Sequence, residues 1–188
     1  MIFVPWRNGM SHNQAEFAEP QPIQAEQPMR TILAEPITAA AFAPFGELLA
    51  PPDGFSRHYF DAALSNARPA ARPSLSMAVA EPLKSLPLDA VHMERHAFSS
   101  QSFVPMDAAR YLAIVAPHAA GGGPDAERAR AFLVAGRYGV TYRADVWHHP
   151  MAVLDRPSTF AIVMWLDGSE GDTELLTLAA PFRVGIAD

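Results

Sequence analysis

The sequence contains no cysteine, which excludes disulfide bonds and catalysis by a thiolate. No apolar run approaches the ~18 residues that a helix needs to span a bilayer. Basic residues are not gathered either: 14 Lys and Arg stand against 20 Asp and Glu, and the formal net charge is -6. A nucleic-acid surface needs clustered positive charge. We therefore expect neither a membrane nor a nucleic-acid partner, and an anionic substrate must be held by a few local cations or a metal.

The first ten residues, "MIFVPWRNGM", contain only a short apolar stretch before Arg7. This stretch is too short for the hydrophobic core of a signal peptide. Together with the lack of cysteine, it predicts a cytoplasmic protein.

Two regions of the chain differ in composition. Residues 1–28 are rich in Gln, Glu, Pro and Ala without a clear period, which predicts an irregular N-terminal extension. The alternative is an arm that packs on a partner subunit. Regular patterning begins at Met29, and the length of 188 residues suits one well-cored domain. We therefore expect a single domain over residues 29–188.

The 18 prolines disfavour long helices, and short apolar segments separated by Gly, Pro, Asp and Ser predict a mainly β sandwich or small barrel. Thr38 is placed to cap a short helix that extends through Phe42. The stretch "GGGPDAERAR" predicts a loop that leads into a turn of helix. The predicted strands are residues 58–63, 74–80, 91–98, 101–106, 111–117, 130–136, 139–144, 151–155, 159–166 and 174–178. Two of them, "YLAIVAP" and "TFAIVMWL", are almost wholly apolar, so we expect both of their faces to be covered.

Metal-capable side chains concentrate in two stretches, "VHMERHAFSSQSFVPM" and "GVTYRADVWHHP". Alternate residues of a strand share a face, so Glu94 and His96 point the same way. The four residues between His96 and Gln101 allow a turn that brings Gln101 back opposite them. The second stretch offers His148 at the end of a strand. Imidazole nitrogen with carboxylate or amide oxygen is a set of groups that binds a divalent metal.

A single His or Glu at a strand end is usually solvated or held by a structural hydrogen bond. The spacing of the four residues together favours a shared pocket instead. The adjacent histidines of the second stretch must face opposite sides of an extended chain. Alternation alone does not say which of the two, His148 or His149, faces the cavity.

The two stretches resemble the cupin pattern, in which one hairpin supplies His-x-His and a later carboxylate, and a second supplies another histidine. Here Glu94 stands at the first histidine position, His96 at the second, Gln101 at the carboxylate and His148 at the last. The resemblance implies a cupin-like β-barrel, or double-stranded β-helix, with one or two short helices. It also places the site residue at the first histidine after Trp147, so we assign His148 to the cavity and His149 to the outer face, with Pro150 where the strand bends away.

Three blocks extend the resemblance: "TAAAFAPFGELL", "MERHAFSSQSFVPM" and "RAFLVAGRYGVTYRADVWHHP". In order and spacing they are similar to the ureidoglycolate lyase family, over roughly Met29 to the C-terminus. Membership implies a homodimeric carbon–nitrogen lyase of the amidine-lyase type. It would cleave (S)-ureidoglycolate to glyoxylate and urea in the breakdown of allantoin and purines. Nickel, or another divalent metal, is the cofactor that the family implies.

The likeness weakens in residues 52–82, where the family places arginines that suit the substrate carboxylate. His58 occupies the position of the first of these, Asp61 is retained, and the strand after them has no basic residue. We expect His58, Asp61 and Arg143 to bind the substrate, with Arg57 and Arg95 as further nearby cations. A neutral histidine replaces a bidentate guanidinium poorly.

Two mechanisms fit these residues. A metal held by Glu94, His96, Gln101 and His148 would lower the pKa of the substrate hydroxyl. Without a metal, His96 or His148 would act as the general base. Two other functions remain open: a paralogous cupin enzyme acting on another small hydroxy or ureido acid, and a non-catalytic cupin that binds a small acid.

Overall fold

The computed structural model describes residues 29–169 and 171–187, which fold into two β-sheets with short helical turns. The seven-stranded sheet has the order β10-β6-β7-β1-β12-β4-β9. Its strands are β1 (Thr31–Pro36), β4 (Leu88–His96), β6 (Tyr111–Ala116), β7 (Arg130–Val134), β9 (Trp147–His148), β10 (Ala152–Val153) and β12 (Thr173–Ile186). The five-stranded sheet has the order β2-β8-β5-β11-β3 and contains β2 (Gly46–Leu49), β3 (Arg72–Ala80), β5 (Gln101–Asp107), β8 (Gly139–Tyr142) and β11 (Ser158–Leu166). The helical turns are α1 (Ala39–Phe42), η1 (Asp61–Ala63) and η2 (Ala126–Arg128).

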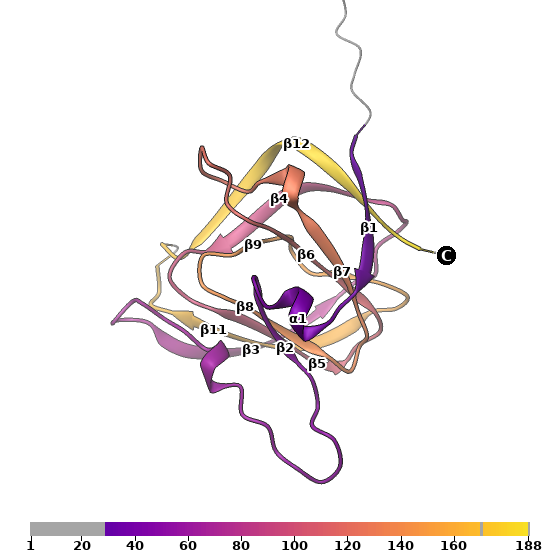
Figure 1. Cartoon of the computed structure of the whole chain (residues 1–188). Helices are drawn as coiled ribbons and strands as arrows, with labels where there is room; N and C mark the ends of the chain where they lie inside the picture. Colours follow the sequence, from indigo (N-terminus) through magenta and orange to yellow (C-terminus); the bar gives the residue numbers. More distant parts are fainter. Residues whose placement is uncertain (1–28, 170, 188) are drawn as a thin grey trace, which may run out of the picture.

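The sheets enclose a barrel. Strand β9 pairs with β4 on one side and with β6 on the other, so the larger sheet closes on itself. In Figure 1, β12 and β4 lie at the top, β11, β3 and β5 lie at the bottom, and α1 lies between the two walls. The prediction of a mainly β, cupin-like barrel with short helices is confirmed.

Two hydrophobic clusters stabilise the barrel, and β6 contributes to both. Tyr111 and Val115 belong to a cluster that joins the two sheets, together with Phe132 and Phe160. The alternate residues of β6, such as Ile114, belong to a second cluster formed by the larger sheet. All six residues of β6 are buried, as its apolar sequence predicts. Strand β11 differs, because only Ser158 and Phe160 are buried and the rest of the strand is half-buried or exposed, so the expectation that both of its faces are covered is not met within the chain.

The cap of α1 is as predicted. The Thr38 hydroxyl accepts a hydrogen bond of 3.1 Å from the amide of Ala41, which satisfies a free donor of the first turn. The helical turn predicted after the glycine-rich loop is η2. One predicted strand is wrong: residues 58–63 form irregular chain that ends in η1. This segment lies on the surface, where no neighbouring strand takes up its backbone hydrogen bonds, so its aromatic and apolar residues alone do not make it a strand.

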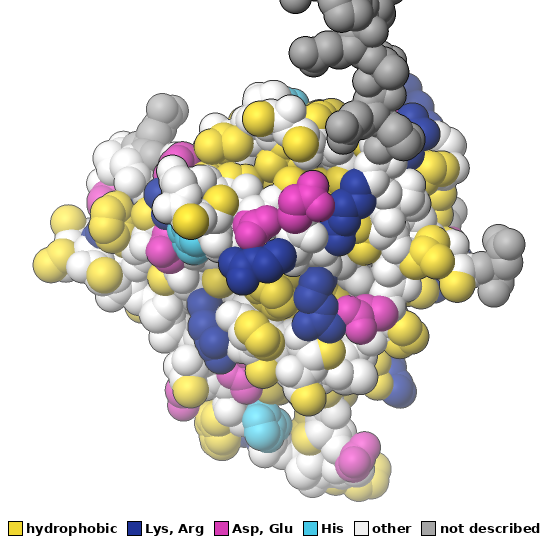
Figure 2. Space-filling model, turned by 45° about the horizontal axis from the view of Figure 1, so that its top comes forward, with side chains coloured by type: hydrophobic (Ala, Val, Ile, Leu, Met, Phe, Trp, Pro, Cys, Tyr) yellow, Lys and Arg dark blue, Asp and Glu magenta, His cyan; other side chains and the backbone are white. Residues whose placement is uncertain are grey.

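The surface mixes the two signs of charge. In Figure 2, dark-blue basic and magenta acidic side chains lie next to each other and do not gather by sign. Ion pairs of the same kind join Arg130 to Glu35 and Arg183 to Asp89 across neighbouring strands. Among the described residues, the helical segments are all too short to cross a membrane.

Candidate active site

The four side chains singled out from the sequence converge. Glu94 and His96 lie at the end of β4, Gln101 is the first residue of β5, and His148 is the last residue of β9. Glu94 and His148 are opposite each other in the antiparallel register. One nitrogen or oxygen atom each of Glu94, His96 and His148 lies within 4.8 Å of the others. The hairpin and the second stretch therefore meet in space.

The hydrogen bonds of His148 fix which of its nitrogens faces the cluster. Its Nδ1 lies 2.9 Å from the carbonyl oxygen of Val146, and a carbonyl only accepts, so Nδ1 donates. Its Nε2 lies 3.2 Å from Oε1 of Gln101 and 3.4 Å from Oε1 of Glu94. A neutral ring therefore turns the Nε2 lone pair towards two oxygen atoms, unless the Gln101 amide is turned to present its nitrogen. A proton or a cation bound between Nε2 and these two oxygen atoms replaces the repulsion of their lone pairs with attraction.

His96 presents the second nitrogen. Its ring is buried, and Nδ1 lies 3.2 Å from the hydroxyl oxygen of Thr173. Its Nε2 is buried and has no hydrogen-bond partner among the described residues. The ring centroids of His96 and His148 are 5.7 Å apart. A buried imidazole nitrogen without a partner is costly, so this atom points to a group that binds between the two rings.

An aromatic wall supports the cluster. The ring of Tyr142 stacks on His148 with centroids 4.2 Å apart and an interplanar angle of 11°. Phe103 packs edge-on against Tyr142 in the cluster that joins the sheets. Burial raises the pKa of Tyr142 well above its ordinary value, so its hydroxyl stays protonated. The wall keeps His148 in one orientation.

The surroundings set the charge of the cluster. Burial of Glu94 works against ionisation, but the contact with His148 and the nearby His96 outweigh it, so the pKa of this carboxyl is lowered. Burial, together with His148, lowers the pKa of His96 despite the opposing effect of Glu94. Near pH 7 the cluster therefore contains a carboxylate and a neutral His96. These are the forms that bind a metal or accept a proton.

The donor set fits a divalent metal ion. Two imidazole nitrogens, a carboxylate and an amide oxygen converge from three strands, a combination that suits nickel, zinc and related ions. The Nδ1 of each ring is held by an oxygen, which leaves Nε2 for the ion. Glu94 is the most exposed of the three titratable groups and marks the open side of the site.

Comparison with known proteins places the chain in a family. A family model described as ureidoglycolate lyase matches residues 29–185. The chain belongs to the ureidoglycolate lyase family. It is 36% identical over 144 residues to a ureidoglycolate lyase of Burkholderia mallei (strain NCTC 10229), covering 72% of this chain and 82% of the relative. It is also 36% identical over 143 residues to a ureidoglycolate lyase of Brucella melitensis biotype 2, covering 72% and 83%.

The three residues expected to bind the substrate of a ureidoglycolate lyase are not part of this cluster. His58 and Asp61 are exposed in the segment between β2 and β3, where the His58 ring packs on Phe60. Arg143 is exposed directly after β8. Among the described residues, no hydrogen bond or ion pair joins any of the three to Glu94, His96, Gln101 or His148.

Sequence reasoning missed a buried polar network behind His96. Asp172 accepts hydrogen bonds from the amide of Phe98 (2.8 Å) and from the Ser99 hydroxyl. It also pairs with Arg68 at 3.0 Å, and Arg68 pairs with Asp167 at 2.8 Å. The partners come from three distant segments, so no local pattern indicates them. For Tyr142 the sequence does contain a signal, because this residue lies in the second metal-capable stretch, six residues before His148.

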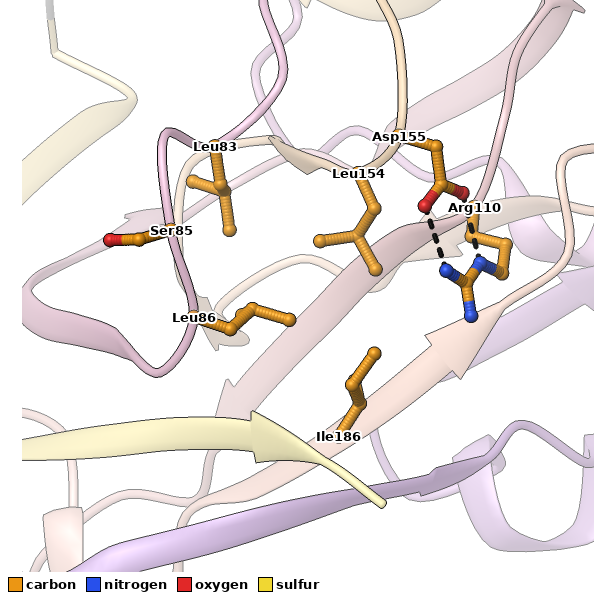
Figure 3. Close-up of a pocket in the computed structure, with 7 residues that line it drawn as sticks. All are labelled: Leu83, Ser85, Leu86, Arg110, Leu154, Asp155 and Ile186. Atoms are coloured by element: carbon orange, nitrogen blue, oxygen red, sulfur yellow. Dashed lines mark hydrogen bonds and ion pairs between the residues drawn. The ribbon is translucent and has the colours of Figure 1, made fainter. Parts of the chain in front are cut away.

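A depression elsewhere on the molecule does not coincide with this site. It has a volume of about 200 Å³, and Figure 3 shows leucine and isoleucine side chains around it, with Arg110 and Asp155 paired at one side. The guanidinium donates to both carboxylate oxygens, at 2.9 and 2.7 Å. Both charged groups of the depression are thus already paired. The residues that line it are Leu83, Ser85, Leu86, Arg110, Leu154, Asp155 and Ile186.

Proposed function

We propose that the protein is a ureidoglycolate lyase that cleaves (S)-ureidoglycolate to glyoxylate and urea. The observation that carries the proposal is the convergence of Glu94, His96 and His148 within 4.8 Å in a chain that belongs to this lyase family. The reaction belongs to allantoin and purine catabolism, and we assign it to the cytoplasm.

The reaction needs a proton acceptor and a proton donor but no nucleophile. Ureidoglycolate has a hydroxyl and a ureido nitrogen on the same carbon. Removal of the hydroxyl proton lets the C–O bond become a carbonyl while the C–N bond breaks and its electron pair stays on nitrogen. The nitrogen then takes up a proton to give urea. One proton leaves oxygen and one arrives at nitrogen, so a single imidazole is able to carry it.

His96 is the residue that we assign to this proton transfer. Its Nε2 makes no hydrogen bond to any described residue, and its lowered pKa keeps the ring neutral near pH 7. His148 has a fixed donor on Nδ1, which suits a ligand or an orienting role. Gln101 and Glu94 hold oxygen atoms beside it.

In the alternative mechanism, Glu94, His96, Gln101 and His148 would hold a divalent cation, with nickel as the first candidate, and Nε2 of His96 would then be a ligand and would not carry the proton. When bound, such an ion supplies a positive charge that lowers the pKa of a substrate hydroxyl. The two Nε2 atoms and the Glu94 carboxylate are the groups that would hold it in place. The exposed Arg143, His58 and Asp61 remain our candidates for contacting the substrate carboxylate and ureido group.

We further propose that the protein is a homodimer joined through the outer face of the five-stranded sheet. Strand β3 is the edge strand of that sheet, and three of its alternate side chains are exposed: Leu75 (70%), Met77 (58%) and Val79 (69%). Met106 of β5 is exposed to 62%. A row of apolar side chains beside an unpaired strand edge is typical of an interface between copies.

The dimer is tested by light scattering in dilute solution, which should give twice the chain mass of 20.4 kDa. A Met77→Glu variant places a charge in the proposed interface and should sediment as a monomer. Arg137→Glu changes an exposed residue outside this sheet and should leave the dimer intact. A parent protein with the mass of one chain contradicts the proposal.

The enzymatic proposal is tested with purified protein, racemic ureidoglycolate, and assays for glyoxylate, urea and ammonia. The protein is first freed of metal with a chelator and then assayed with and without nickel. We expect glyoxylate and urea in equal amounts, no ammonia, and a stop at half conversion because one enantiomer is used. Release of ammonia identifies a hydrolase instead, and absence of all products under both conditions overturns the proposal.

A further inference from the structure

The two imidazoles of the site are held by partners of different chemistry. The Nδ1 of His148 faces the carbonyl oxygen of Val146, which only accepts. The Nδ1 of His96 faces the hydroxyl of Thr173 at 3.2 Å, and a hydroxyl both donates and accepts. His148 is therefore restricted to one neutral tautomer, whereas the partner of His96 permits both.

Thr173 owes its position to the register of the sheet. It is the first residue of β12 and is directly opposite His96 on β4. Side chains that face each other across an antiparallel pair lie on the same side of the sheet, so the hydroxyl meets the ring without a bend in either strand. As a β-branched residue, threonine also has few χ1 rotamers.

The residue before Thr173 is anchored to the turn that follows His96. The carbonyl of Asp172 accepts a 2.9 Å hydrogen bond from the amide of Ala97, and its buried carboxylate accepts another from the amide of Phe98 at 2.8 Å. Arg68 adds an ion pair at 3.0 Å. These bonds hold the residue before Thr173 against the turn that follows His96, so the two side chains stay next to each other.

We propose that Thr173 is a positioning residue that directs Nε2 of His96 to the centre of the site. When the hydroxyl accepts from Nδ1, the lone pair of Nε2 faces Glu94 and His148; when it donates, Nε2 carries the hydrogen. What this positioning by Thr173 does for catalysis rests on the proposed lyase function. Its consequence for the His96 ring follows from the contacts alone.

The chain contains a matched control for this contact. Thr177, on the same strand, lies 3.2 Å from Nδ1 of His92, the same geometry at an exposed histidine outside the cluster. We compare Thr173→Val, which removes the hydroxyl and keeps the shape, with Thr173→Ser, which keeps the hydroxyl. Thr177→Val is the control for loss of a hydroxyl from β12.

Each full-length variant is measured in three ways. The ¹⁵N resonances of the imidazoles report the tautomer of each histidine, calorimetric titration with nickel reports metal affinity, and steady-state kinetics give kcat and KM. Loss of a partner that orients a ligand typically costs ~10–100-fold in affinity or activity. For Thr173→Val we expect shifted His96 resonances, a nickel Kd raised roughly tenfold or more, and lower kcat with little change in KM. Thr173→Ser should stay near the parent in all three.

Thr177→Val should move only the His92 resonances and leave nickel affinity and kcat unchanged. If Thr173→Val keeps parental His96 resonances, the hydroxyl does not position the ring and the proposal is overturned. It is also overturned if Thr173→Ser loses as much as Thr173→Val, because the methyl group is then what matters. If the parent itself neither cleaves ureidoglycolate nor binds nickel, the proposed function fails, and the ¹⁵N comparison still decides whether Thr173 orders His96.

Discussion

The buried cluster and the segment between β2 and β3 show two ways of placing polar residues. Glu94, His96 and His148 lie on strands, and each has neighbours that fix its orientation. His58 and Asp61 lie in a long irregular segment and are exposed to solvent. The first group is preorganised within the chain, whereas the second is exposed, and His58 contacts only its neighbour Phe60 among the aromatic rings of the described residues. The comparison separates the groups to which we assign the chemistry from those that we expect to recognise the substrate.

The largest expected effect comes from the strand side of this comparison. His148→Ala removes a ring that contacts Gln101, Glu94 and Tyr142. We expect the variant to abolish turnover and nickel binding with little loss of fold, because a group that holds or orients the reacting partners is lost. Kinetics, metal analysis and circular dichroism measure these.

His149→Ala is the control. This ring is half-buried and its Nδ1 donates to the carbonyl of Pro150, so the variant should keep most of its activity or lose stability first. If His149→Ala is inactive and His148→Ala is active, the register of β9 in the proposed site is wrong.

These two groups also mark how far the sequence predicts the structure. Alternation along a strand and the length of a turn are local properties, so Glu94, His96 and Gln101 were expected to share a face. The Thr38 cap was predicted for the same reason. The composition of residues 58–63 predicts a strand, but they lack a neighbouring strand to pair with.

Long-range partners account for what sequence reasoning missed. Strand β12 extends to Ile186, although the sequence indicated only residues 174–178, because β4 and β1 pair with it on both sides. The contact of Thr173 with His96 likewise joins residues 77 positions apart. No pattern within either segment indicates such a pairing.

The second prediction concerns the exposed side of the comparison. Arg143→Ala should raise KM for ureidoglycolate about tenfold, the worth of a hydrogen bond to a charged group, with kcat and nickel affinity close to the parent. His58→Ala and Asp61→Ala should have smaller effects of the same kind. Arg137→Ala, at another exposed arginine, should change neither constant. A fall in kcat or nickel affinity for Arg143→Ala places this residue in the cluster instead.

A third prediction uses the burial of the imidazoles. Burial lowers the pKa of His96 and of His149 below the ordinary 6.5. As the pH falls below ~6.5 the unfolded chain binds protons that the folded chain does not, so the free energy of unfolding is at its full value above this pH and decreases below it. Each imidazole contributes at most about 1.4 kcal/mol per pH unit.

Urea unfolding between pH 7.5 and 5.5 measures this dependence. At still lower pH, below the ordinary glutamate pKa of 4.5, the lowered pKa of Glu94 adds a further loss of stability in the same direction. A His149→Gln variant should show a shallower dependence than the parent, because one titrating ring is gone. Stability that rises on going from pH 7.5 to 5.5 contradicts the assignment of buried, neutral rings.

The smallest effect is expected outside both groups, in residues 1–28, which lie outside the described residues. Strand β1 begins at Thr31 and pairs with β12 and β7, and within the described part of the chain both hydrophobic clusters are complete with residues from Ile32 onwards. We therefore propose residues 29–188 as the catalytic domain and predict that a protein beginning at Met29 keeps the parental Tm and activity. A protein beginning at Ile37 lacks β1 and should not fold, which shows that the assay responds to loss of a strand. A drop in Tm of about 3 °C or more for the Met29 protein, equivalent to about 1 kcal/mol at this chain length, would mean that the first 28 residues pack on the domain or on a partner subunit.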